Sequence, residues 1–157
     1  MSEEMPEDKP EVGMIHRPRV LSYWVILLEA AILRSMKQSL KEFGISESQF
    51  IILDMCFRRE ANTAGSIAKL AHYDPSVISR QVDNLYKKGL LNRHRNKEDR
   101  RVVHLSLTDE ACILREELLS AAIEADERIT RHLDPKEHDI LLDLVRKLVI
   151  TLEKKSK

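Results

Sequence analysis

The chain is poor in the residues that form turns and covalent cross-links. Among its 157 residues are only four glycines, five prolines and two cysteines, and aromatic residues make up 4% of the total. Sandwiches and barrels need many tight turns, so this composition favours a mainly helical fold. Two cysteines provide neither a disulfide framework nor the spacing of a metal site.

Long apolar runs, targeting signals and catalytic motifs are also missing. No run approaches the roughly 20 apolar residues that cross a bilayer, and the acidic N-terminal segment lacks the basic and apolar regions of a signal peptide. The sequence contains no Gly-rich phosphate loop and no nucleophile elbow, and its six histidines form no metal-binding cluster. We therefore expect a cytoplasmic protein that is not an enzyme and has no membrane contact, cofactor or metal.

Charged residues of the two signs are equal in number but unevenly distributed. Residues 87–101 contain seven basic and two acidic side chains, whereas residues 108–143 contain four basic and eleven acidic ones. This asymmetry indicates one end that faces an anionic partner and another that faces away from it. An ordinary solvated charge run is the alternative, and charge alone does not decide between the two.

Apolar residues at helical spacing predict six helices. The first spans about residues 19–42 and ends at Gly44. The other five begin after residues that are good N-caps, and Ser46 also has a glutamine three positions later, as in a capping box. These predicted N-caps are Ser46, Thr63, Asp74, Thr108 and Asp134.

Between the fourth and fifth helices the apolar period changes from helical to two. Two alternating runs, residues 90–95 and 102–107, flank a polar loop, which predicts a β-hairpin. A basic hairpin that follows a short helix, a tight turn and a second helix is typical of a winged helix-turn-helix. The fold class predicted is therefore mainly α with a small β-hairpin wing.

A helix fits the major groove of B-DNA, where its outward side chains reach base edges. The fourth helix has a narrow apolar stripe of Ile78, Val82 and Leu85, which would fix its opposite face outward. A hairpin tip with exposed arginines suits a narrow minor groove, whose negative potential is enhanced. The candidate DNA-binding residues are Ser76, Ser79, Arg80, Asn84, Lys87, Lys97, Asp99, Arg100 and Arg101.

Asp99 is unexpected beside phosphates, so we expect its carboxylate to hold a neighbouring arginine side chain in one direction. Two alternatives remain open at this point. In the first, the fourth helix is an ordinary amphipathic surface helix and the hairpin tip is a solvated turn. In the second, the module is a winged helix that binds protein instead of DNA.

Several motifs occur in a fixed order along this region. They include a Ser-Arg pair in the fourth helix and an Asp-x-Arg wing motif before a Leu-Thr helix start. The residues concerned are 49–53, 67–68, 74–85, 88–93, 99–101 and 105–108. In these motifs the chain resembles the MarR family of bacterial transcription regulators, and because the flanking helices also fit, the resemblance covers nearly all of residues 19–155.

The resemblance implies a homodimeric repressor that binds palindromic operators in double-stranded DNA. The first and the last two helices would meet at the two-fold axis, and the wings would enter minor grooves. By position Arg101 matches the family's minor-groove arginine and Asp99 its orienting partner, although the neighbouring Arg100 leaves the wing-tip residue open. Composition predicts a flexible acidic arm at residues 1–16, to which the resemblance assigns no role. The rest of the chain is predicted to form a dimerisation helix, a DNA-binding domain and C-terminal dimerisation helices at residues 17–44, 45–108 and 109–157.

Many members of that family are released from DNA by small aromatic acids or phenols bound between the dimer helices and the DNA module. Arg34, Arg17 or His16 would meet the carboxylate of such an effector, and ordinary core packing is the alternative role of the apolar candidates. Those candidates are Tyr23, Trp24, Leu27, Phe50 and Leu53. Cys56 and Cys112 lie in apolar helical patterns, so we expect both to be buried and unreactive.

Overall fold

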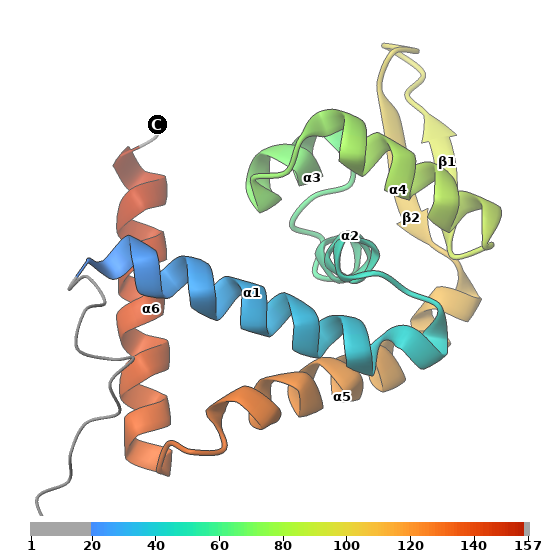
Figure 1. The fold of residues 1–157 in the computed structure, drawn as a ribbon. Coiled ribbons are helices and arrows are strands. Elements are labelled where there is room, and N and C mark those ends of the chain that lie inside the picture. Colours follow the sequence, from blue (N-terminus) through green and yellow to red (C-terminus); the bar gives the residue numbers. More distant parts are fainter. Residues whose placement is uncertain (1–19, 156–157) are drawn as a thin grey trace, which may run out of the picture.

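The computed structural model describes residues 20–155, and within them it has six α-helices, one 3-10 turn and a two-stranded hairpin (Figure 1). The mainly helical fold with a β-hairpin wing is therefore confirmed. The predicted acidic arm at residues 1–16, and with it His16 and Arg17, lies outside the described residues. The helices are α1 (Leu21–Ser39), α2 (Glu47–Phe57), α3 (Ala64–Ala71), α4 (Pro75–Lys87), α5 (Asp109–Thr130) and α6 (Pro135–Lys155).

The first helix ends three residues earlier than the sequence predicted. After Ser39 the fully buried Leu40 donates its N–H to the Met36 carbonyl at 2.8 Å, and a 3-10 turn, Lys41–Phe43, follows. Gly44 then takes the left-handed conformation, with φ of 61°, which glycine adopts at little cost. This tighter ending brings the chain directly into the cap of α2.

The predicted caps are present. The Ser46 and Gln49 side chains form the reciprocal capping box of α2, and Thr63 with Ser66 forms a second one at α3. Pro75 occupies the first turn of α4, where its missing N–H leaves no hydrogen bond unmade. Local side-chain chemistry thus fixes where each helix of the module begins.

The buried core lies among α2, α3, α4, the base of the hairpin and the first half of α5. Ile52, Ile67, Ile78 and Leu85 are completely buried, and Leu91 at the start of the hairpin is 1% exposed. The predicted inward stripe of α4 is confirmed, because its three residues are all buried. Burial of this stripe leaves the polar side of α4 in solvent.

The end of α1 packs along α5 through small residues and one arginine. The Ser35 hydroxyl donates to the Ala125 carbonyl at 2.8 Å, and the Arg128 guanidinium donates to the Ser35 carbonyl at 3.1 Å. The same guanidinium also hydrogen-bonds the buried Ser39 hydroxyl. These contacts join α1 and α5 into one arm, which Figure 1 shows running away from the hairpin toward α6.

A single chain leaves the apolar faces of α1 and α6 exposed. Trp24 is 43% and Leu27 41% exposed, and Leu144 and Leu148 on α6 are about half exposed, at 55% and 49%. Exposed apolar surface on this scale marks an interaction site in a soluble protein. Nothing in residues 20–155 is both long and apolar enough to cross a bilayer as a helix.

The two cysteines differ in exposure, which corrects the expectation that both are buried. Cys56 on α2 is half-buried and free, whereas Cys112 is exposed and free. The apolar pattern of α5 was misleading at this position, because the neighbouring Ala111 takes the inward place and turns Cys112 outward.

Burial raises the pKa of the Cys56 thiol to about 11. The thiolate is the reactive form, so at pH 8 iodoacetamide should modify Cys112 well before Cys56. Peptide mass spectrometry over a time course measures this order, and Cys112→Ser is the control, in which early labelling should disappear. Equal labelling of the two cysteines would contradict the burial described for Cys56.

Candidate nucleic-acid interface

The outward face of α4 carries the predicted polar side chains. Ser79, Arg80 and Lys87 are exposed, whereas Asn84 is half-buried, with its Nδ2 lying 3.5 Å from Gln81 Oε1. The exposed side chains follow one face of a helix of 13 residues. The structure therefore places these candidates on one surface that a groove of DNA could receive.

The first turn of α4 is organised by Asp74. Its carboxylate accepts the backbone N–H of Ser76 at 2.7 Å and also accepts the Ser76 hydroxyl. These hydrogen bonds from Ser76 lower the pKa of Asp74 below its usual value. The Ser76 hydroxyl is thus engaged within the helix cap, a contact that the sequence analysis did not anticipate.

A buried glutamine ties α4 to α2. Gln49, which is 5% exposed, donates from Nε2 to Gln81 Oε1 at 2.8 Å. Lys88, just after α4, donates from Nζ to Gln49 Oε1 at 3.1 Å and to the Gly44 carbonyl. The sequence predicted Gln49 only as a capping residue, because its partner lies 32 positions away.

The wing consists of strands β1 (Leu91–Arg95) and β2 (Val103–Leu107), which pair antiparallel as predicted. In this register Arg93 lies opposite Leu105, and His94 lies opposite His104. Only the first residue of β1 is buried. The hairpin is attached at its base, where the Leu105 N–H donates to the Asn62 carbonyl at 2.7 Å.

The wing tip is shaped by two side chains that accept backbone N–H groups. Asn96 Oδ1 accepts from Glu98 at 2.8 Å, and Asp99 Oδ1 accepts from Arg101 at 2.9 Å. Asp99 therefore contacts the Arg101 backbone, whereas the sequence predicted a contact with an arginine side chain. The basic candidates, Lys97, Arg100 and Arg101, are all exposed on this turn.

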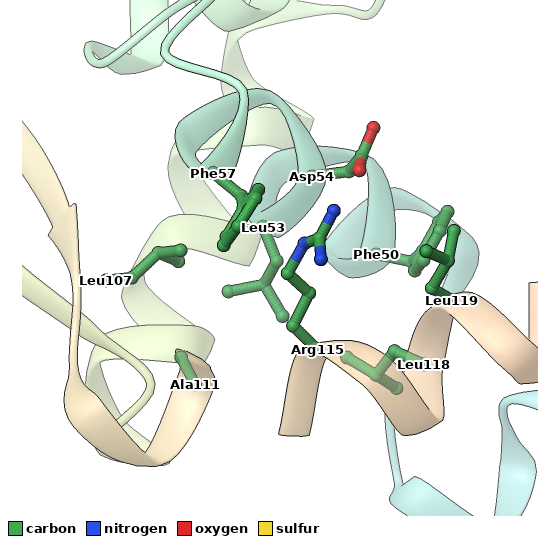
Figure 2. A pocket seen from close by; sticks show the side chains of 9 residues that line it. All are labelled: Phe50, Leu53, Asp54, Phe57, Leu107, Ala111, Arg115, Leu118 and Leu119. Carbon is green, nitrogen blue, oxygen red and sulfur yellow. The ribbon is translucent and has the colours of Figure 1, made fainter. Parts of the chain in front are cut away.

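A narrow hollow lies behind the wing, between α2, β2 and α5 (Figure 2). Arg115 of α5 reaches into it, with the guanidinium carbon 3.6 Å from the centre of the Phe57 ring. Its Nη1 pairs with Glu116 Oε1 at 2.6 Å, while its buried Nε has no hydrogen-bond partner among the described residues. The lining residues are Phe50, Leu53, Asp54, Phe57, Leu107, Ala111, Arg115, Leu118 and Leu119.

Only two of the predicted effector-binding residues, Phe50 and Leu53, line this hollow. The remaining four candidates, which lie on α1, do not line the hollow. Of these, Trp24, Leu27 and Arg34 are exposed, and Tyr23 is half-buried.

The sequence analysis missed Arg115. A signal existed, because this arginine lies four residues after the buried Ala111 and three before the buried Leu118, on the inward side of α5. Within residues 20–155 no group of three potential metal ligands comes together.

Comparison with known proteins agrees with this geometry. The family model described as transcriptional regulator SarA/Rot matches residues 34–118. The HTH-type transcriptional repressor MdtR of Bacillus subtilis is 34% identical over 85 residues, which are 54% of this chain and 55% of that protein. The chain thus spans about half the length of this relative.

Two solved structures show the same fold. A mutant MarR from E. coli in complex with operator DNA has a TM-score of 0.72 and 22% identity, covering 82% of this chain and 92% of that one. BpsR of Bordetella bronchiseptica, whose DNA binding is described as regulated by 6-hydroxynicotinic acid, has a TM-score of 0.74 and 20% identity, covering 85% and 96%. The matched family model and MdtR are both described as transcriptional regulators, the class that the sequence analysis expected. The chain belongs to the SarA/Rot transcriptional regulators, and it has the winged helix-turn-helix fold of the MarR structures.

Proposed function

We propose that this protein is a homodimeric, cytoplasmic repressor that binds an inverted repeat in double-stranded DNA. The observation that carries the proposal is the exposed polar face of α4, which lies beside a basic wing. Both belong to the module formed by residues 45–108. The apolar faces of α1 and α6 are exposed in a single chain. A second copy of the chain that covers these faces would remove them from water. The repressor role is supported by the name of the relative MdtR.

In this proposal α4 lies in the major groove, with Ser79 and Arg80 toward base edges and the half-buried Asn84 beside them. Ser76 contacts a base edge only as an acceptor, because its hydroxyl donates to Asp74. Lys87 and Lys97 contact phosphates, so they contribute affinity without sequence preference. Arg101, or its neighbour Arg100, enters the adjacent minor groove and responds to groove width more than to base identity. Asp99 holds the turn that presents these arginines, because it accepts the Arg101 N–H.

We further propose that a small aromatic anion regulates binding through the hollow behind the wing. Arg115 provides a cation that is paired through Nη1 with Glu116, while its Nε has no partner among the described residues and the Phe57 ring lies against its guanidinium. The hollow is narrow, so a ring that enters it must shift α2 relative to α5 and with them the wing. Regulation of BpsR by 6-hydroxynicotinic acid, an aromatic acid, supports this class of effector.

Selection of bound sequences from a random duplex pool tests the dimer and the operator together. Two recognition helices related by a two-fold axis should select an inverted repeat with half-sites about one helical turn apart. Arg80→Ala should relax the preference at one position of each half-site by about 1–3 kcal/mol if Arg80 contacts guanine. A selected single half-site would exclude the dimeric mode, and no enrichment at all would favour the protein-binding alternative.

The wing makes a prediction with an informative sign. Asp99→Ala removes a negative charge near phosphates, yet it should weaken DNA binding about fivefold, because the turn loses a hydrogen bond of about 1 kcal/mol. Asp99→Asn is the matched control: it removes the same charge, keeps an acceptor oxygen and should retain affinity. Fluorescence anisotropy with labelled operator measures both. Tighter binding by Asp99→Ala would reduce the wing to a diffuse positive charge.

Benzoate should release the protein from its operator, whereas the neutral benzamide should not. In Arg115→Gln the benzoate concentration that gives half-release should rise about tenfold or more, because a charge-assisted hydrogen bond of about 1.5–3 kcal/mol is lost. Anisotropy titrations measure the release, and thermal melting checks that the variant is folded. Equal release by the two compounds, or an unchanged variant, would argue against Arg115 as the anion site.

A further inference from the structure

The two strands of the wing differ in how they are held, because every residue of β2 is at least partly buried whereas β1 is exposed after Leu91. Leu91 and Leu105 are buried at its base, but the remaining four residues of β1 are exposed. The attachments there are the Leu105 backbone bond to the Asn62 carbonyl and the Thr108 hydroxyl bond to the Gly89 carbonyl at 2.8 Å. These bonds hold β2 and the end of the hairpin, so the direction of the exposed part of β1 beside α4 depends on contacts of its own.

One side chain of the exposed part of β1 reaches α4, at the level of Leu105 on the paired strand. Arg93 on β1 forms a hydrogen-bonded ion pair with the Asp83 carboxylate, and its guanidinium carbon lies 4.9 Å from the centre of the Tyr86 ring. Figure 1 shows β1 alongside α4. Asp83 and Tyr86 are three residues apart, and therefore lie one turn from each other on the side of the helix that faces the wing.

We propose that Arg93 and Asp83 are positioning residues that set the angle between the wing and the recognition helix. This inference rests on the proposed function, in which α4 and the wing contact DNA together. With the pair intact, the wing tip is held where the minor groove lies when α4 occupies the major groove. Without the pair, the wing moves independently of α4. The affinity for DNA then no longer depends on the sequence that flanks each half-site.

The exposure of the pair separates this role from a purely structural one. The Arg93 and Asp83 side chains are 33% and 55% exposed. Ion pairs exposed to this extent contribute little to folding stability. Replacing either partner should therefore leave the fold intact while it releases the wing.

The charges involved also distinguish positioning from general electrostatics. Neutralising Asp83 removes a negative charge from the DNA-binding side, so charge alone predicts tighter binding to every duplex. Neutralising Arg93 removes a positive charge, so charge alone predicts the opposite. Positioning predicts the same selective loss for both variants, namely the loss of the preference for particular flanks.

The test compares two operators with identical half-sites, one with A·T-rich and one with G·C-rich flanks, by fluorescence anisotropy at fixed salt. The wild-type ratio of affinities should favour A·T-rich flanks, and Asp83→Asn and Arg93→Gln should each bring that ratio close to one. The preference for half-site bases should persist in both variants. The double variant should resemble each single variant, because the two residues act as one unit.

Two further variants sharpen the result. Arg93→Lys keeps the ion pair and should restore most of the flank preference. Arg95→Gln removes the same charge from β1, where Arg95 has no hydrogen bond or ion pair with α4 among the described residues. It should weaken binding to both operators alike and leave the ratio unchanged. Thermal melting should give similar unfolding temperatures for all variants.

The outcomes separate this inference from the proposed function. If wild type shows the flank preference and the Asp83 and Arg93 variants keep it, the positioning role is wrong while the function stands. If Arg95→Gln also brings the ratio of affinities for the two operators close to one, the effect is one of charge and the inference again fails. A wild-type protein that binds the operator without any flank preference would overturn the wing proposal and this inference with it.

Discussion

The burial of one side of α4 is the constraint on which the interface depends. Ile78, Val82 and Leu85 allow only one rotation of this helix against α2 and α3. The opposite side then has to carry whatever the helix presents to a partner. Gln81, hydrogen-bonded to the buried Gln49, fixes the same rotation by polar contact, so apolar burial and a specific hydrogen bond agree on one orientation.

The fifth helix connects three parts of the molecule that otherwise have little contact. It begins at the base of the wing, continues past the hollow that contains Arg115 and packs against α1 through Arg128. The α1–α5 arm is held by hydrogen bonds to backbone carbonyls, which small residues such as Ala125 make accessible. A change in the hollow therefore acts on a helix that both the wing and the proposed dimer interface share.

Features decided by neighbouring residues were predictable from the sequence. The caps at Ser46 and Thr63 depend on side chains three positions away, and the inward stripe of α4 depends on helical period alone. Features decided by tertiary packing were not. The pairing of Arg93 with Asp83 depends on how the hairpin lies beside the helix, which neither the helical period of α4 nor the alternation in the hairpin determines.

Arg115 and Cys112 show the same limit in opposite directions. Each lies on α5, where the apolar pattern is shared between the DNA module and the arm, so the inward face is ambiguous in the sequence. The Arg115 guanidinium lies against the Phe57 ring, a cation–π contact that draws the side chain inward while Nη1 keeps its ion pair with Glu116. The smaller Cys112 side chain has no such contact to make and stays outside.

The length of α5 has a mechanical consequence. Its 22 residues form a continuous helix, which at a rise of 1.5 Å per residue is a rod of about 33 Å. A tilt of about 5° at the end beside the hollow would displace the other end by about 3 Å. In a pair of such molecules the two displacements would add across the two-fold axis. A movement at each hollow that is smaller than a side chain would then change the distance between the two recognition helices. The change would be comparable with the rise of one to two base pairs.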